Sequence, residues 1–300
     1  MSIKRLKRLG LGLISLSLVG LSLASCSQEE LLNRATNAAI GAGIGLIQGQ
    51  TLTPESENRM GEEVRREIFR EYRAYTGSEQ LVSYVRSVGN QLLSHAGRRD
   101  EVNYRFDVLD SPEINAFAIP GGSVFITTEA LKYLRNEAEL AAVLGHEIAH
   151  VSQKHTVESL QRALVAQGLL QGGLSQRDSQ LLQGAAVLTL DLILKGFSRE
   201  QEREADRVGA VLAVRHQYAE EGLIGFLQTL QEVSGDSPGG LVQFLLTHPG
   251  LEERMTLLRQ FLAEQQLSPE NPILNADRYR DHVRVLPAKV PIGPARAGTT

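Results

Sequence analysis

Hydrophobic positions recur at helical spacing along most of the chain after residue 54. A charged helical segment follows Pro54. The apolar residues that share one face of the next helix are Leu81, Val85, Val88 and Leu92. Three more helical patterns are apolar at 181–197, charged at 198–214 and amphipathic at 251–266. The pattern predicts a mostly helical protein whose helices pack on a shared core.

The spacing changes from helical to alternating between residues 102 and 108. Every second residue there is apolar, which predicts a half-buried strand, and these residues are Val102, Tyr104, Phe106 and Val108. Residues 115–119 and 123–127 predict two further strands on either side of a Pro-Gly-Gly turn. A small sheet among helices is therefore expected, and the predicted fold class is α+β.

The first 25 residues have the pattern of a secretory signal. The basic stretch MSIKRLKR precedes a 15-residue apolar run, shorter than the roughly 20 residues that a membrane-spanning helix needs. Small residues precede Cys26, the only cysteine of the chain, and this arrangement resembles the lipobox of bacterial lipoproteins. The resemblance implies cleavage before Cys26 and a diacylglycerol on its sulfur. The alternative is a plain signal peptide with an incidental cysteine.

The residue after Cys26 indicates where the protein is located, and the net charge excludes one class of partner. Ser27 stands where lipoproteins of the inner membrane usually have Asp, so the resemblance implies the periplasmic face of the outer membrane of a Gram-negative bacterium. Residues 1–25 contain four of the 31 basic residues and none of the 35 acidic ones, so their removal changes the net charge from −4 to −8. Such an acidic protein binds nucleic acid poorly, and no nucleic-acid partner is expected.

Four segments are expected along the chain. They are a signal peptide at 1–25, a lipid-anchored tether at 26–53, a globular domain at 54–267 and a C-terminal tail, ordered only in part, at 268–300. Small residues dominate 38–47, which is too short to span a bilayer. This stretch is either a loose tether or a helix whose glycines allow a close helix contact.

The candidate chemistry lies in the stretch LGHEIAHVSQKH. Asn136 and Glu139 have capping-box spacing and strong helix formers follow, so the stretch is expected on a helix. Four residues turn a helix by about 400°, so His146 and His150 lie on one face and can bind one metal ion. Glu147 is placed to act as a base on water rather than as a ligand, which is the division of roles in a hydrolytic zinc site.

A third metal ligand has to come from elsewhere in the chain. The metzincin continuation requires Gly at 153 and His at 156, and the chain has Gln153 and Thr156, which excludes that class. The stretch SREQEREAD offers Glu202 and Asp206 on one helical face, with Glu204 pointing away. One carboxylate could bind the metal while the other accepts the free N–H of a ligand histidine. The alternative is a solvated charge cluster.

His155 is a further histidine close to the candidate ligands in sequence. It lies five positions after His150, about 140° away around a helix, so contact with solvent or with a ligand is expected rather than metal binding.

Five motifs in the same order resemble the M48 family of metallopeptidases, over roughly residues 55 to 265. They are NAFAIPGG at 115–122, NEAELA at 136–141, HEIAH at 146–150, EREAD at 202–206 and THP at 247–249. The resemblance implies a mostly helical zincin domain, gluzincin-like, with the small sheet beside the HExxH helix. It further implies that His146, His150 and Glu202 bind one Zn²⁺ ion. Glu147 is then the general base, and Asp206 accepts a hydrogen bond from a ligand histidine.

The same resemblance places His248 and Arg254 near the metal. His248 would either stabilise the oxyanion of a tetrahedral intermediate or occupy the free zinc position and keep the enzyme latent. The remaining alternative is an ordinary loop histidine before Pro249. Gly250 stands where a second proline is common in the family, a departure that concerns only the loop conformation.

Asn115, Ala116 and Phe117 belong to a predicted strand next to the metal helix. In related zincins such a strand adds an extended substrate peptide to its edge, so that backbone hydrogen bonds hold many different sequences. The structural alternative is a buried strand followed by a turn, and the two interpretations are compatible.

The resemblance implies a zinc-dependent endopeptidase that hydrolyses unfolded or misassembled envelope proteins through a zinc-activated water. The alternative is a periplasmic chaperone or assembly factor for outer-membrane proteins with a latent zinc site. The expected partners are unfolded or misfolded proteins, the membrane through lipid on Cys26, and the outer-membrane assembly machinery. The apolar helix at 181–197 is a lid over the cleft, a membrane-facing helix or part of the core.

Overall fold

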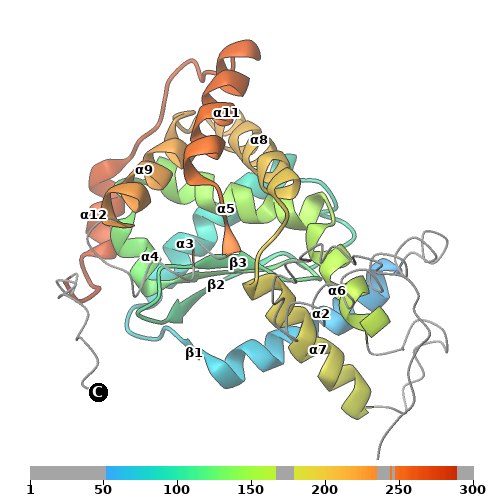
Figure 1. The fold of residues 1–300 in the computed structure, drawn as a ribbon. Coiled ribbons are helices and arrows are strands. Elements are labelled where there is room, and N and C mark those ends of the chain that lie inside the picture. The colour runs from blue at the N-terminus through green and yellow to red at the C-terminus, as the bar shows by residue number, and fades with distance from the viewer. Residues whose placement is uncertain (1–51, 167–178, 235–243, 245–246, 289–300) are drawn as a thin grey trace, which may run out of the picture.

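A four-stranded sheet separates two groups of helices in the computed structural model, which describes residues 52–166, 179–234, 244 and 247–288 (Figure 1). The strands are β1 (Arg73–Ala74), β2 (Arg105–Asp110), β3 (Ala116–Ala118) and β4 (Ser123–Thr127). Their order across the sheet is β1-β2-β4-β3. β2 and β4 are parallel, whereas β1 and β3 pair antiparallel with their neighbours. Because β3 stands at one end of the strand order, it is an edge strand.

The helices lie on both faces of this sheet. On one face are α3 (Glu79–Leu92) and α5 (Glu137–Ser152), and on the other are α2 (Pro54–Glu71) and α7 (Ser179–Leu194). On the side of α5 that faces away from the sheet lie α8 (Arg199–Arg215), α9 (Gly222–Ser234) and α11 (Leu251–Glu264). The shorter or peripheral helices are α4 (Thr128–Tyr133), α6 (His155–Ala166), α12 (Ala276–Val283) and a 3-10 turn at Leu93–His95. The expected mostly helical α+β class is confirmed.

Residues of β2, β3 and β4 belong to two different cores, one on each face of the sheet. Val108, Val124 and Ala116 face α3 and α5, whereas Leu109 and Phe125 face α2 and α7. The prediction of a half-buried strand at 102–108 was wrong in two respects: β2 begins three residues later, and its four central residues are all buried. The reason is that helices cover both faces, so the second face of β2 is not exposed to solvent.

The turn between β3 and β4 has the predicted conformation. Gly121 and Gly122 have φ angles of +80° and +94°, in the left-handed region that glycine adopts readily. The turn packs closely on α2, because a Cβ atom on Gly61 would lie 2.2 Å from the Pro120 carbonyl oxygen. Glycine at these positions therefore lets the sheet and α2 approach each other.

The apolar helix α7 belongs to the core along one face. Ala186, Leu190 and Ile193 are buried against α2 and the sheet, while Val187 is 44% exposed. Of the three interpretations of 181–197, the core interpretation therefore describes the side chains that are defined. Within the described residues, none of the helices combines the length and the apolar character that crossing a membrane requires.

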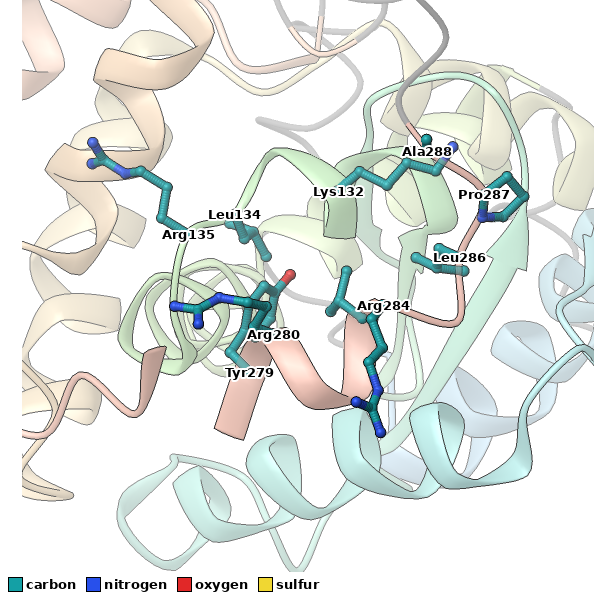
Figure 2. Close-up of a pocket in the computed structure, with 10 residues that line it drawn as sticks. Lys132, Leu134, Arg135, Tyr279, Arg280, Arg284, Leu286, Pro287 and Ala288 are labelled. Atoms are coloured by element: carbon teal, nitrogen blue, oxygen red, sulfur yellow. The ribbon is translucent and has the colours of Figure 1, made fainter. Parts of the chain in front are cut away.

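The packed part of the chain continues past residue 267, where the globular domain was expected to end. Tyr279 of α12 is 2% exposed and Leu286 is 7% exposed, and both belong to the main core. A pocket of about 410 Å³ lies between α12 and the segment that follows α4 (Figure 2). The predictions for the signal peptide, Cys26 and the small-residue stretch at 38–47 concern positions outside the described residues.

Candidate metal centre

The histidines of the HExxH motif lie on α5 in the middle of the core. Asn136 caps this helix, because its side chain accepts a hydrogen bond from Glu139 N at 2.9 Å. The Glu139 carboxylate does not close the predicted capping box; it accepts hydrogen bonds from the backbone N and the Nε of Arg135, each at 2.7 Å. All residues from Glu137 to Val151 are buried, so α5 presents His146, Glu147 and His150 away from solvent.

Two glycines allow α8 to approach α5 beside the first histidine. A Cβ atom on Gly209 would lie 2.7 Å from His146 N, and one on Gly145 would lie 2.9 Å from the Gly209 carbonyl oxygen. Both distances are too short for a real Cβ atom, so the crossing requires glycine on both helices. Because the backbones meet here, the carboxylates one and two turns before Gly209 reach the histidines of α5.

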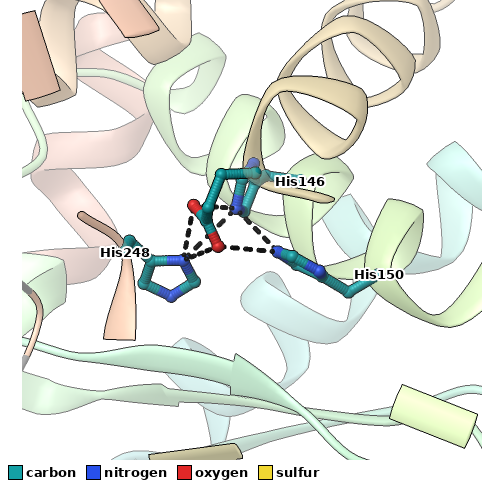
Figure 3. A group of neighbouring side chains, drawn as sticks. His146, His150 and His248 are labelled. Atoms are coloured by element: carbon teal, nitrogen blue, oxygen red, sulfur yellow. Dashed lines mark hydrogen bonds and ion pairs between the residues drawn. The ribbon is translucent and has the colours of Figure 1, made fainter. Parts of the chain in front are cut away.

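Four side chains place their ligand atoms together at this crossing. The group consists of His146, His150, Glu202 and His248, and one ligand atom from each lies within 4.8 Å of all the others (Figure 3). His146 Nε2 lies 3.1 Å from His150 Nε2 and 3.5 Å from Glu202 Oε2. Glu202 Oε1 lies 3.4 Å from His150 Nε2. All four side chains are almost completely buried.

The donor set and its dimensions fit a zinc ion. Ligands bound at about 2.0–2.1 Å with tetrahedral geometry are about 3.4 Å apart, close to the spacing of these nitrogen and oxygen atoms. Imidazole nitrogens with one carboxylate are ligands that zinc binds. The histidines and Glu202 would hold the ion. Glu147, on α5 with His146 and His150, would lie next to it.

His248 joins this group through one ring nitrogen and contacts the sheet through the other. Its Nδ1 lies 3.1 Å from both carboxylate oxygens of Glu202 and 3.4 Å from His146 Nε2. Its Nε2 donates to the carbonyl oxygen of Ala116 at 3.2 Å. The Nδ1 lone pair and the carboxylate oxygens of Glu202 would repel each other unless a proton or a metal ion lay between them. The position of Nδ1 therefore also favours a cation between His248 and Glu202.

Arg254 of α11 forms ion pairs with two buried carboxylates of α8. Its Nε and Nη2 donate to the two oxygens of Asp206 at 2.8 and 2.6 Å, and its Nη1 lies 2.8 Å from Glu202 Oε2. Burial alone would raise the pKa of Asp206, but the charge and hydrogen bonds of Arg254 outweigh it and lower the pKa to about 2. Arg254 thus contacts the carboxylates, and its guanidinium keeps them ionised.

Asp206 also lies beside the first ligand histidine. Its Oδ1 is 2.9 Å from His146 Nδ1, out of line with the ring N–H. Burial alone would lower the pKa of His146, but the contacts with Asp206 and Glu202 outweigh it and raise the pKa to about 9. Burial likewise opposes ionisation of Glu202, yet the charges of His248 and Arg254 keep its pKa well below the usual value.

His155 contacts His150, the second candidate ligand histidine, which was one of the two expected alternatives for this residue. Its Nδ1 lies 2.9 Å from His150 Nδ1, and its Nε2 lies 3.2 Å from Glu204 Oε2. The angular argument assumed one continuous helix, but α5 ends at Ser152 and Lys154 has a φ of +67°. The chain reverses there, so His155 returns to the back of the His150 ring.

Phe197 packs on the face of the same ring. Its ring stacks on His150 with the centroids 3.9 Å apart and an angle of 18° between the planes. Phe197 is the last residue of the apolar segment before α8, and it is buried. The stack and the contact with His155 together fix the orientation of the His150 ring.

Glu147 has the environment of a base. Its side chain is 1% exposed, its Oε1 lies 3.6 Å from His248 Nε2, and its Oε2 has no hydrogen-bond partner among the described residues. Burial raises the pKa of this carboxyl, although His248 and His146 oppose the shift. An unpaired buried carboxylate oxygen is costly, so its presence suggests that another group binds there.

Residues 79–262 match the model of peptidase family M48. The chain belongs to peptidase family M48. The match covers α3 to α11 and includes every element that contributes to the metal centre.

Relatives within the M48 family come from bacteria and eukaryotes. The beta-barrel assembly-enhancing protease of Escherichia coli (strain K12) is 32% identical over 253 residues, which cover 81% of this chain and 51% of that protein. The mitochondrial metalloendopeptidase OMA1 of Schizosaccharomyces pombe is 29% identical over 218 residues, which cover 71% of this chain and 63% of that protein. The chain spans about half the length of the bacterial relatives that it matches.

The predicted substrate strand lies beside the M48 metal centre. Asn115 Oδ1 accepts a hydrogen bond from Thr247 Oγ1 at 3.4 Å, and Ala116 contacts His248 as described above. Phe117 points to the opposite side of the sheet and stacks on Phe125, with the ring centroids 5.2 Å apart. The structural alternative therefore describes the Phe117 side chain, and a substrate-binding role for the strand stays a prediction.

Proposed function

We propose that this M48 protein is a zinc-dependent endopeptidase in which His146, His150 and Glu202 are the zinc ligands and Glu147 is the general base. The observation that carries the proposal is the position of the unpaired Glu147 carboxylate oxygen next to the group of potential ligands. Further support comes from relatives whose names describe proteases and metalloendopeptidases.

The side chains around the site have distinct tasks in the proposed reaction. A zinc ion held there supplies a Lewis acid that polarises a peptide carbonyl and acidifies water. Glu147 accepts a proton from the attacking water and returns it to the leaving amine. Its burial favours proton uptake, because burial raises the pKa of the carboxyl. Arg254 forms ion pairs with Glu202 and Asp206, and Asp206 lies beside His146.

The proposed substrate is an extended segment of an unfolded or misassembled envelope protein. The carbonyl of Asn115 accepts from Thr127 N and the amide of Ile119 donates to Ser123 O, so alternate residues of β3 direct these groups toward β4. The backbone groups of Ala116 and Ala118 therefore face the unpaired edge, on the side of His248. A peptide added at this edge would place its backbone beside the ligands. The name of the bacterial relatives, beta-barrel assembly-enhancing protease, supports a link to the assembly of β-barrel proteins.

The position of His248 favours a resting state in which the site is blocked. Its Nδ1 lies among the ligand atoms, and its Nε2 occupies the Ala116 carbonyl that a substrate strand would use. His248 and the substrate would then compete for the same place, and His248 would have to move before turnover. This latent form is also the form that the second candidate function requires, that of a chaperone or assembly factor for outer-membrane proteins.

The proposed location and segment boundaries concern the start of the chain. Lipid on Cys26 would hold the protein on the periplasmic face of the outer membrane, and residues 26–53 would be the tether. The metallopeptidase domain would begin at residue 54. The packing of α12 supports extending that domain beyond residue 267.

The experiment that tests the function compares the full chain with its Glu147→Gln variant on unfolded casein, with the zinc content of both measured. Both proteins are expected to bind about one zinc at the buried centre, and loss of the base is expected to slow cleavage by at least about 10²-fold. Equal cleavage by both would contradict the role of Glu147.

A His248→Ala variant separates the two candidate functions. If wild type binds zinc without cutting and His248→Ala cuts, the protein is a latent protease. If neither cuts while both suppress aggregation of an unfolded outer-membrane protein, the chaperone function is supported instead.

A further inference from the structure

The seven histidines of the chain fall into two groups and one separate residue. Four belong to the buried centre described above, and His282 stacks on the ring of Tyr84. The other two, His95 and His216, meet at the surface together with Ser94. None of these three surface residues has a part in the proposed peptidase site.

The donor atoms of this surface group form a nearly equilateral triangle. Ser94 Oγ lies 3.0 Å from His95 Nδ1 and 3.1 Å from His216 Nε2, and the two ring nitrogens are 3.2 Å apart. Ligands that share a metal ion at about 2.0–2.1 Å are about 2.9 Å apart in octahedral geometry and about 3.4 Å apart in tetrahedral geometry. The triangle therefore has the size of one face of a metal coordination shell.

The orientation of the rings distinguishes convergent ligands from a simple hydrogen bond. When two ring nitrogens point at each other, the ring centroids are as far apart as the nitrogen distance allows. When both nitrogens point at a third atom, the rings lie closer together. The difference between centroid distance and nitrogen distance thus indicates where the nitrogens point.

The buried centre supplies internal standards for both cases. His150 and His155, which contact each other directly, have centroids 5.1 Å apart and nitrogens 2.9 Å apart, a difference of 2.2 Å. His146 and His248, whose ligand atoms gather with those of His150 and Glu202, have distances of 5.2 and 3.4 Å, a difference of 1.8 Å. The surface pair has distances of 5.0 and 3.2 Å, the same 1.8 Å difference. His95 and His216 are thus arranged like the convergent pair.

Solvent access and protonation also suit metal binding at this place. Ser94 and His95 are exposed and His216 is half-buried, so an ion can reach the nitrogens from solution. Burial and the neighbouring His95 lower the pKa of His216, which favours the neutral ring whose lone pair binds metal.

We propose that His95, His216 and Ser94 form a second site, for a divalent transition metal such as Zn²⁺, separate from the buried centre. Imidazole ligands suit Zn²⁺, Cu²⁺ and Ni²⁺, and water completes the shell. His95 ends the 3-10 turn after α3, and His216 caps the C-terminus of α8. A bound ion therefore links α3 to the helix that carries Glu202.

The test counts zinc ions on the full chain by equilibrium dialysis after removal of metal with a chelator. Wild type is expected to bind about one zinc ion more than His95→Ala and His216→Gln at saturating zinc. His282→Ala is the matched control, since it removes a histidine outside both groups, and it is expected to bind as much zinc as wild type. Circular dichroism of the metal-free proteins checks that each variant is folded.

The result that overturns the proposal is equal zinc content in wild type, His95→Ala and His216→Gln, all folded. The measured quantity is the difference of one ion between wild type and variant. The outcome therefore does not depend on whether the buried centre binds zinc or whether the protein cleaves casein.

Discussion

The rings of His146 and His150, the two candidate metal ligands on α5, are supported in different ways. A carboxylate held by Arg254 lies next to His146, whereas His150 contacts a second histidine that in turn contacts Glu204. If His150 binds metal through Nε2, its Nδ1–H donates to His155 Nδ1, and His155 Nε2–H donates to the Glu204 carboxylate. Every ring nitrogen in this chain of contacts then has one partner, so Glu204 indirectly sets the tautomer of His150.

We expect His155→Gln to weaken zinc binding at the buried centre by about 10–100-fold, the usual effect of losing a group that orients a metal ligand. Metal affinity is measured by competition with a chromophoric chelator, and His282→Gln provides the control. Unchanged affinity in a folded His155→Gln protein would show that Phe197 alone holds the His150 ring.

The ion pair of Asp206 and Arg254 predicts part of the acid stability. The pKa of Asp206 is lowered from 3.8 to about 2, so the folded state prefers the ionised form. Its contribution is complete above pH 4, is lost as the pH falls toward 2, and amounts to about 2 kcal/mol. Urea unfolding of the metal-free protein between pH 5 and pH 2 should therefore show a shallower decline in Asp206→Asn than in wild type. Parallel pH profiles would contradict this assignment.

The candidate metal site depends on the crossing of two helices, α5 and α8. α5 supplies two histidines and α8 the carboxylates, and the two helices touch through glycine backbone at Gly145 and Gly209. Neither glycine belongs to a turn, so local sequence gives no conformational reason for them. The signal that could have identified them was a small residue next to each motif, just before His146 and three positions after Asp206.

We expect Gly209→Ala to destabilise the protein by about 1–3 kcal/mol, because the new methyl group would lie 2.7 Å from the His146 backbone nitrogen. Separation of the helices should also weaken zinc binding, since Glu202 moves away from the histidines. Chemical denaturation and zinc titration measure the two effects. Arg215→Ala, at an exposed position of the same helix, should change neither, and a Gly209→Ala protein as stable as wild type would show that the crossing tolerates a side chain.

For the whole molecule, the segment after α11 closes the core around the start of α5. Glu137, the first residue of that helix, accepts hydrogen bonds from Tyr84 at 2.8 Å, from Tyr218 at 3.0 Å and from Asn275 at 2.8 Å. α12 follows Asn275 and buries Tyr279. Segments far apart in sequence therefore meet at the N-terminus of α5, the helix that carries the HExxH motif.

The pocket beside α12 has a basic lining whose charges are already paired. Lys132, Arg135, Arg280 and Arg284 line it (Figure 2). Their ion-pair partners are Glu129, Glu139, Asp277 and Asp281, respectively. This pairing gives the pocket no excess of positive charge with which to attract an anion.

We expect truncation after residue 267 to lower the stability by about 3 kcal/mol or more, because it removes the buried Tyr279 and leaves Glu137 without Asn275. Truncation after residue 288 keeps all of these contacts and is the matched control. Thermal and urea unfolding compare the two proteins. Equal stability would show that the globular domain does end at 267.

Local sequence predicts most of the helices and strands of this protein and the residues of its candidate metal centre. Helical patterns predicted α2, α3, α7, α8 and α11, and alternation predicted β2, because periodicity reports which face of a segment is buried. Capping-box spacing and helix formers predicted α5, and the Pro-Gly-Gly turn predicted β3 and β4 on either side of it. The HExxH spacing placed His146, Glu147 and His150 within one turn, since a helix has fixed geometry over four residues. The family motifs indicated Glu202, Asp206, His248 and Arg254, which the structure places together.

Tertiary structure decided what local spacing cannot express. Periodicity gives the buried face of β2 but not the second layer of helices, so the burial of its other face was missed. The chain reversal at Lys154 returns His155 to His150, and helix α12 joins the core across a long sequence separation. The pairing of His95 with His216 likewise depends on where α3 and α8 end in space. Periodicity does not report the turn that brings His155 back to His150, and the other contacts join segments that no window of neighbouring residues contains.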